Sequence, residues 1–226
     1  SFEIRETEIA RHKTALIRYG FSAPVQSLAR FGFLDGTKTI FDYGCGRGDD
    51  LRGLKENNIT ANGWDPYFLP EPELIEADIV NLGFVINVIE DIAERNEALE
   101  RAFSLCKDFL VVSAMLASED KVFGKPYGDG YITQRGTFQK YFSQFSLKQY
   151  IEVTLNTEAI PVSPGVFYVF KDKLKEQDYL YSRQKSRRNL LRTSILIRSR
   201  KTTKEKRIEK YELHKDLLEP LWLQMI

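Results

Sequence analysis

The sequence predicts an α/β protein with a mostly parallel sheet, and three features of the chain support this fold class. Residues 39–57 read as a short strand, a glycine-rich turn and a helix. A second short strand closes on Asp65, where a nucleotide-binding α/β unit carries an acidic residue. Two apolar segments, 78–82 and 109–114, then enclose an amphipathic segment at 93–107. Strands that alternate with helices in this way are typical of a parallel sheet.

The glycine turn is the most informative stretch of the chain. A strand that ends at Asp42 is followed by Gly44, Gly46 and Gly48, and a helix is expected over 49–57. Glycine lets the backbone adopt left-handed angles and approach a ligand closely. The spacing Gly-x-Gly-x-Gly differs from the Gly-x-Gly-x-x-Gly of dinucleotide-binding proteins. Glycine turns also join strands to helices for structural reasons alone.

Asp65 is the second candidate site residue. It stands 21 residues after Gly44, at the end of the short strand expected over 61–64. At this position a carboxylate can accept hydrogen bonds from two ribose hydroxyls. The alternative is that Asp65 and Pro66 only start a turn. The spacing and the flanking residues together favour the ribose role.

The acid followed by three alternating glycines resembles motif I of the class I S-adenosylmethionine-dependent methyltransferases. The resemblance implies a Rossmann-like fold and S-adenosyl-L-methionine as cofactor, with the backbone at 44–48 against its methionine end and Asp65 at its ribose. The full fold has a further helix and strand after the second strand, and the Pro-rich passage 66–72 is too short for both. We therefore expect a shortened central region. The expected cofactor-binding residues are Asp42, Tyr43, Gly44, Cys45, Gly46, Gly48, Asp49, Asp65, Pro66, Leu82 and Gly83.

Asn81 and Phe84 are the expected catalytic residues, because ligands of open α/β sheets bind where the strands end. Amino-methyltransferases carry (Asp/Asn/Ser)-Pro-Pro-(Tyr/Phe) at this edge: the polar side chain accepts from the target amine and the ring stacks on the base. The segment Asn81-Leu82-Gly83-Phe84 resembles this pattern at its first and fourth positions and lacks both prolines. A strand end with an ordinary core phenylalanine explains it equally well.

Two helices are expected before the first strand of the sheet. Apolar spacing predicts one over 3–19, and Ser22 is expected to cap a second that runs to Phe31. Together they suit a lid over the cofactor site, although simple packing against the sheet explains them equally well.

The second half of the predicted domain contributes a loop, a helix and a final strand. Residues 117–133 are rich in glycine and polar residues, so we expect a long loop beside the ligand edge. Its side chains Tyr127, Asp129 and Tyr131 are candidates for the wall of a substrate pocket. A helix is expected over 137–155, with its aromatic residues in the core, and the last strand over 162–171. That strand is expected to be half of an antiparallel pair.

The net charge of +1 hides an uneven distribution of charge. Residues 183–215 contain 13 Lys and Arg against 3 Asp and Glu, whereas residues 1–182 contain 20 against 27. Such a basic segment is either a solvated helix or linker, or it binds nucleic-acid phosphates in a salt-dependent way. DNA is accordingly the expected partner, with residues 183–215 as its contact.

Other classes of protein fit the composition poorly. No stretch approaches 18 consecutive apolar residues and no secretory signal is visible, so we expect neither a membrane span nor a membrane partner. Cys45 and Cys106 lie far apart, which favours a reducing cytoplasm over a disulfide framework. His12 and His214 form no metal-spaced cluster with the cysteines, so no metal site is expected.

Several longer stretches resemble one family, the DNA phosphorothioation-associated methyltransferases found with bacterial sulfur-modification and defence gene clusters. The resemblance covers roughly residues 8–172 and implies a methyltransferase that acts on DNA, with partner proteins of a phosphorothioation system. The stretches that carry it are 11–15, 18–25, 41–50, 62–67, 77–91, 126–130 and 135–141.

This resemblance and the charge distribution predict three parts and leave the activity open between several classes. We expect a helical lid at 1–36, a cofactor-binding methyltransferase domain at 37–172 and a basic helical extension at 173–226. The alternatives to a DNA methyltransferase are a non-catalytic, cofactor-binding accessory subunit and a methyltransferase that acts on RNA or a small molecule. A nicotinamide-dependent oxidoreductase is a further alternative, which the glycine spacing disfavours.

Overall fold

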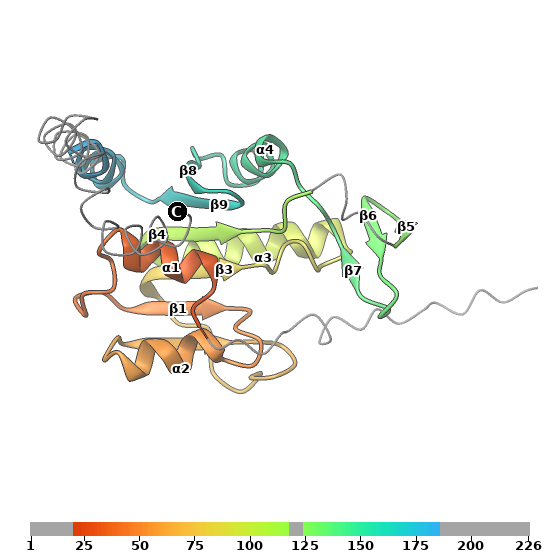
Figure 1. The fold of residues 1–226 in the computed structure, drawn as a ribbon, viewed down its shortest axis with the longest axis horizontal. Coiled ribbons are helices and arrows are strands. Elements are labelled where there is room, and N and C mark those ends of the chain that lie inside the picture. Colours follow the sequence, from red (N-terminus) through yellow and green to blue (C-terminus); the bar gives the residue numbers. More distant parts are fainter. Residues whose placement is uncertain (1–19, 118–123, 186–226) are drawn as a thin grey trace, which may run out of the picture. The chain divides into compact units, whose positions relative to one another are not determined.

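A six-stranded central sheet organises the protein, as seen in a computed structural model that describes residues 20–117 and 124–185 (Figure 1). The strand order is β2-β1-β3-β4-β9-β8. The first four strands are mutually parallel, whereas β9 runs antiparallel to β4 and pairs with β8 in a hairpin. The bounds are β1 Ile40–Tyr43, β2 Ala61–Trp64, β3 Ala77–Gly83, β4 Cys106–Ser113, β8 Ile160–Ser163 and β9 Val166–Phe170. The expected α/β fold with a mostly parallel sheet is confirmed.

Helices cover both faces of this sheet, because the central strands are apolar on both sides. α1 (Ala23–Arg30) packs on β3 and β4, where Ser27 Oγ lies 2.7 Å from Tyr168 Oη of β9. α3 (Ile92–Leu105) packs on the same two strands, and α4 (Gln144–Leu155) packs on α3. The core on the α3 side includes Phe41, Leu82 and Leu110.

The connections between parallel strands reverse direction between β1 and β3. From β1 the chain passes through α2 (Asp49–Glu56) to β2 on one side, whereas from β3 it passes through α3 to β4 on the other. Such a switch point opens a crevice outside the carboxyl ends of the two strands, where ligands of Rossmann-like folds bind. Asp42 of β1 and Asn81 of β3 are paired in register across this switch point.

The central region is short, as expected. Between the end of β2 and the start of β3 the chain forms no further helix or strand, only an isolated bridge between Asp65 and Leu69. At the other end of the sheet, the expected antiparallel pair is confirmed as the β8–β9 hairpin.

Residues 124–142 differ from the prediction of a loop followed directly by a helix. They contain a second, three-stranded antiparallel sheet made of β5 (Lys125–Tyr127), β6 (Gly130–Ile132) and β7 (Phe138–Gln139). The helix expected over 137–155 begins only at Gln144, because Ser143 caps it with a capping box. Figure 1 shows the small sheet beyond the carboxyl ends of β1 and β4.

The remaining predictions concern the two ends of the chain. The second expected helix is α1, whereas the helix expected over 3–19 lies outside the described residues. The chain divides into two compact units, 1–176 and 177–226, and residues 173–185 are helical. The expected boundaries at 36/37 and 172/173 stay predictions.

None of the helices within the described ranges has the length and apolarity needed to cross a membrane.

Candidate functional site

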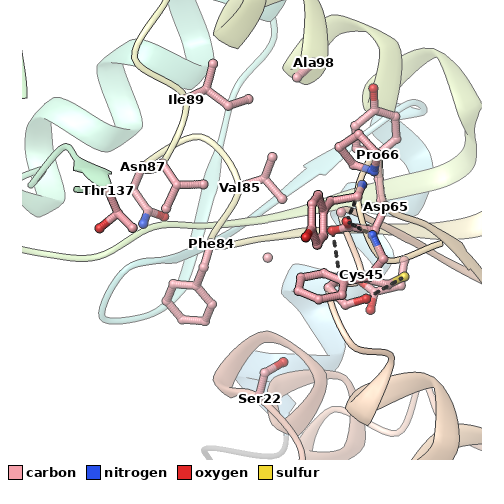
Figure 2. Close-up of a pocket in the computed structure, with 18 of the residues that line it drawn as sticks. Ser22, Cys45, Asp65, Pro66, Phe84, Val85, Asn87, Ile89, Ala98 and Thr137 are labelled. Atoms are coloured by element: carbon pink, nitrogen blue, oxygen red, sulfur yellow. Dashed lines mark hydrogen bonds between the residues drawn. The ribbon is translucent and has the colours of Figure 1, made fainter. Parts of the chain in front are cut away.

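A pocket of about 960 Å³ opens at the carboxyl ends of β1, β2 and β3. Its wall is built from four elements of the first unit: the glycine turn after β1, the turn after β2, the segment after β3, and the chain around the small sheet. Figure 2 draws Cys45, Asp65 and Pro66 on one side of the view and Asn87 and Thr137 on the other, with the ring of Phe84 between them. The pocket therefore lies where the strand order predicts a ligand.

The glycine turn is held in a left-handed conformation at three positions. The φ angles of Gly44, Gly46 and Gly48 are 81°, 54° and 74°, a region that residues with a Cβ rarely adopt. A Cβ on Gly44 would also overlap the Cγ2 methyl of Val85, which packs against the turn. Two separate constraints, backbone angle and packing, therefore require glycine at position 44.

The backbone N–H groups of the turn donate within the protein. The amides of Gly44 and Cys45 both donate to Trp64 O, at 2.7 Å and 3.0 Å, and the amide of Gly48 donates to Cys45 O at 3.0 Å. The amide of Gly46 donates to Asp65 Oδ2 at 3.0 Å. These four amides are therefore not available to a ligand at the turn.

Asp65 links the turns after β1 and β2. Besides the amide of Gly46, its carboxylate accepts the amides of Tyr67 and Phe68, both at 2.9 Å. The turn that was the alternative explanation of Asp65 and Pro66 is therefore present. A carboxylate has about four acceptor positions, so these three bonds leave capacity for a further donor. Asp65 lines the pocket, and its binding of ribose stays a prediction.

Asn81 is buried at the base of the pocket and bonded to Asp42. Asn81 Nδ2 donates to Asp42 Oδ1 at 2.8 Å. An ionised carboxylate only accepts, so this bond fixes which end of the amide faces Asp42. Asn81 Oδ1, buried at the other end, has no hydrogen-bond partner within the described part of the chain.

Phe84 occupies an unusual backbone conformation directly after β3. Its φ angle is +60°, and its amide donates to Ser113 O at 2.9 Å. A bulky residue in the left-handed region is strained by roughly 1–3 kcal/mol, and such strain gathers at functional sites. The turn places Phe84 in the pocket wall, where Figure 2 shows its ring pointing toward Ser22.

The charge around the pocket is predominantly negative. Six carboxylates and three arginines line it; the carboxylates are Asp42, Asp49, Asp50, Asp65, Glu94 and Glu97. Two of the arginines are engaged, because Arg47 stacks on the Phe68 ring at 4.7 Å and Arg101 pairs with Glu97. Such a lining favours a neutral or cationic ligand over an anion.

Cys45 is an unreactive thiol at the pocket wall. Burial, and next the charges of Asp42 and Asp65, raise the pKa of Cys45 to about 12. Because the thiolate is the nucleophilic form, Cys45 contributes packing and not covalent chemistry. Both Cys45 and Cys106 are free thiols. Within the described ranges, no cluster of three or more His, Cys, Asp or Glu could hold a metal.

Most of the residues singled out from the sequence are brought together in one wall. Gly48 and Leu82 are the exceptions: Gly48 is the N-cap of α2 and Leu82 is fully buried in the core. Their expected role as direct cofactor contacts has no support in the pocket geometry. The residues that do line the pocket are Asp42, Tyr43, Gly44, Cys45, Gly46, Asp49, Asp65, Pro66, Asn81, Gly83 and Phe84.

The substrate wall differs from the one expected at Tyr127, Asp129 and Tyr131, because these three residues do not line the pocket. Asp129 instead pairs with Arg95 and Lys140. The wall comes from the chain that joins β6 to β7, from β7 itself and from the segment that follows it. Its residues are Thr133, Gln134, Arg135, Thr137, Gln139 and Tyr141, and the sequence analysis also missed Ser22, Asn87, Glu94 and Glu97.

The chain is similar in structure to several class I methyltransferases. One is the Burkholderia thailandensis 1,6-didemethyltoxoflavin-N1-methyltransferase with S-adenosylhomocysteine bound (TM-score 0.45, 15% identity, covering 73% of this chain and 77% of that one). Another is the sugar N-methyltransferase KedS8 from Streptoalloteichus (TM-score 0.48, 13% identity, covering 69% of this chain and 96% of that one). A third is the CcbJ methyltransferase from Streptomyces caelestis (TM-score 0.47, 12% identity, covering 70% of this chain and 93% of that one).

No family model matches the chain, and no curated protein sequence matches it. The assignment to the Rossmann-like α/β class therefore rests on the strand order and strand directions.

Proposed function

We propose that the protein is an S-adenosylmethionine-dependent methyltransferase. The observation that carries the proposal is the cradle at the switch point, where the amides of Gly44, Cys45, Gly46 and Gly48 donate within the protein and six carboxylates line the wall. Such a cradle complements a nucleoside that carries a positive sulfonium and an ammonium group. The spacing of Gly44, Gly46 and Gly48 differs from the Gly-x-Gly-x-x-Gly of dinucleotide-binding proteins, so an oxidoreductase is disfavoured.

The residues of the wall divide into a cofactor side and a transfer side. The backbone of 44–46 would hold the methionine end, and the remaining acceptor capacity of Asp65 would take a ribose hydroxyl. When bound, S-adenosylmethionine supplies a methyl group already activated by the sulfonium. The task of the protein is then to align a nucleophile and to exclude water, and no metal ion is required.

An amine is the nucleophile that the transfer side suits best. Asn81 Oδ1 is a buried acceptor, and Asp42 prevents the amide from turning its nitrogen toward the ligand. Asn81 Oδ1 would accept a hydrogen bond from an N–H of the amine, so that the nitrogen lone pair points away from Asn81. Phe84 would pack on the ring that carries the amine.

DNA within a phosphorothioation-linked bacterial modification or defence system is the acceptor that we propose. The support is the resemblance of residues 8–172 and the basic stretch 183–215, most of which lies outside the described residues. The acidic pocket would then receive a base, while phosphates bind to the basic stretch. A cytoplasmic location and partner proteins of that system belong to the same proposal.

Three alternatives keep specific support. A non-catalytic, cofactor-binding accessory subunit is favoured by the absence of both prolines at Leu82 and Gly83. A methyltransferase that acts on a small molecule is favoured by the negative lining, which suits an amine. RNA would use the same basic stretch as DNA.

Calorimetry decides the cofactor. Titration with S-adenosylhomocysteine should release heat and titration with NAD should not. Gly44→Ala should abolish the binding, whereas Gly32→Ala should retain it, because Gly32 is also left-handed but lies outside the pocket. The absence of heat from S-adenosylhomocysteine on folded protein would refute the proposal.

The transfer of a tritiated methyl group shows which class of substrate receives the methyl group. Duplex DNA, an RNA transcript of the same sequence and free amines are each incubated with labelled donor, and Asn81→Ala is the control. Donor binding without transfer to any of them would favour the accessory subunit. Replacement of Lys and Arg in 183–215 by Gln should weaken DNA binding and flatten its salt dependence; unchanged affinity would remove the case for DNA.

A further inference from the structure

Three buried polar atoms in the pocket wall lack hydrogen-bond partners within the described ranges: Ser22 Oγ, Asn81 Oδ1 and Asn87 Oδ1. Each of the three residues is more than nine-tenths buried and lines the pocket. Buried polar atoms are nearly always hydrogen-bonded; Ser113 Oγ is an exception outside the pocket, but three exceptions gathered in one wall call for a common explanation. A ligand that supplies the missing partners is that explanation.

Asn87 lies apart from the cofactor side of the pocket. It belongs to the segment between β3 and α3, and its backbone oxygen accepts the amide of Lys140 at 2.8 Å. This bond ties Asn87 to the chain directly after β7, which belongs to the pocket wall on the side away from the glycine turn. Figure 2 shows Asn87 and Thr137 on the side of the view away from Cys45 and Asp65. On the proposed division of the wall, Asn87 lies on the side left for the methyl-accepting substrate.

The wall around Asn87 is held rigidly by Arg95 of α3. The guanidinium of Arg95 is buried, and it donates to Asp129 through Nη1 at 2.7 Å and Nη2 at 3.0 Å. It also donates to Ile89 O through Nε at 3.0 Å and Nη2 at 2.7 Å. Because Asp129 lies between β5 and β6, this clamp joins the small sheet to the segment that carries Asn87. An unpartnered amide in such a wall is preorganised for a ligand.

We propose that Asn87 binds the methyl-accepting substrate. Its side-chain oxygen accepts a hydrogen bond from an N–H or O–H group of that substrate, separate from the group held by Asn81. The proposal rests on the proposed function and deepens it. It requires a substrate with two donor groups and without a negative charge at the pocket, such as a nucleobase or an amino-bearing hydroxylated ring. Ser22 would contact the same ligand from the α1 side.

Variants at Asn87 separate a ligand-binding role from a structural one. Removal of an unpartnered polar atom should not destabilise the free protein, so Asn87→Leu should keep or raise the melting temperature. Ser113→Ala is the matched control, because Ser113 Oγ is equally buried and unpartnered within the described ranges but does not line the pocket. A fall of more than about 3 °C for Asn87→Leu would mark a structural amide and overturn the proposal.

Binding of probes supplies the functional readout. Saturation-transfer NMR with 2′-deoxyadenosine, 2′-deoxycytidine, 2′-deoxyguanosine and glucosamine identifies which probes bind to the wild-type protein. Asn87→Leu should weaken the bound probe about tenfold, and Ser113→Ala should leave it unchanged. Equal binding to the wild-type protein and Asn87→Leu would overturn the proposal. So would a wild-type protein that binds none of the four probes.

The titration with S-adenosylhomocysteine separates this proposal from the proposed function. Asn87→Leu should bind S-adenosylhomocysteine within about twofold of the wild-type affinity, since Asn87 lies on the acceptor side. A loss of affinity for S-adenosylhomocysteine as large as the loss of affinity for the probe would place Asn87 on the cofactor side and overturn the proposal. A wild-type protein that binds probes but not S-adenosylhomocysteine would refute the methyltransferase and leave the Asn87 contact standing.

Discussion

Asn81 Nδ2 donates a hydrogen bond of 2.8 Å to Asp42 Oδ1, and the two residues lie in register on adjacent parallel strands. These are the strands between which the connectivity of the sheet reverses. The bond has two consequences. It satisfies part of a buried carboxylate, and it orients the Asn81 amide so that its oxygen is the end left for a ligand.

Asn81→Ala should damage both stability and transfer. The loss of a donor to a buried carboxylate should lower the free energy of unfolding by about 1–3 kcal/mol. Loss of the group that orients the nucleophile should reduce methyl transfer by roughly a hundredfold. Denaturant unfolding and the tritium assay measure the two effects. Unchanged transfer in a folded variant would remove Asn81 from the transfer site.

Gly44→Ala should lower the free energy of unfolding by more than the left-handed backbone angle alone explains. Gly32→Ala is the reference, because Gly32 has a φ of 78° and open space around it, and should cost about 1–2 kcal/mol. At Gly44 the added methyl also overlaps Val85. The additional Val85→Ala substitution should therefore recover part of the stability in a double-mutant cycle. Simple additivity of the two substitutions would contradict the packing explanation.

Asp129→Asn should reveal a pH-dependent contribution to stability. The hydrogen bond from Arg95, the largest cause, lowers the pKa of Asp129 from 3.8 to about 2. A carboxyl group whose pKa is lower in the folded state stabilises the protein above its unfolded pKa, and this contribution is lost as pH falls through the folded value. Asp129 is an exposed residue and water screens its pair with Arg95, so the free energy of unfolding of the wild-type protein should exceed that of the variant by about 1 kcal/mol at neutral pH.

Denaturant unfolding between pH 7 and pH 2 checks this, and the difference should shrink toward zero across roughly pH 4 to 2. Glu97→Gln is the control: its pair with Arg101 is exposed, so its removal should cost less than about 1 kcal/mol at neutral pH. A constant difference between the wild-type protein and Asp129→Asn would show that Asp129 acts through packing and not through its charge.

Ser22→Ala should leave stability almost unchanged, although Ser22 is the N-cap of α1. Removal of a capping side chain typically costs about 1 kcal/mol. The Ser22 side chain makes no capping bond; its backbone amide donates to Asp50 Oδ1 at 2.8 Å and its carbonyl accepts the amide of Gln26 at 2.8 Å. Thermal unfolding of Ser22→Ala against Ser143→Ala, which breaks a complete capping box, makes the comparison. Equal losses would show that Ser22 does cap the helix in solution.

The parts of the site that the sequence revealed are those governed by local rules. Alternate glycines at 44–48 indicate left-handed backbone wherever they occur, and an acid after a short strand lies at the edge of the sheet in any parallel arrangement. The switch-point pocket, with Asp42, Asp65 and Asn81 in its wall, follows from these local signals and from the order of strands and helices.

The region of 117–155 was predicted poorly because its structure depends on pairing between short segments. The strands of the small sheet span only two or three residues each, so no period of alternation can develop. Phe138 and Phe142 have helical spacing, yet Phe138 lies in a strand and Phe142 precedes the helix. Both are buried, so the prediction of core aromatics is confirmed for these two; it is wrong for Phe145, which is 74% exposed, and for Tyr141, which lines the pocket.

The sequence by itself determined the parallel α/β core, the glycine turn and the carboxylate beside it, because each depends on the backbone preferences of neighbouring residues. Only the tertiary structure decided the acceptor side. Arg95 meets Asp129 from 34 positions away, and Asn87 is buried where its carbonyl accepts the amide of Lys140, 53 positions further along the chain. Burial without a partner is a property of the folded surroundings, and no local pattern of residues encodes it.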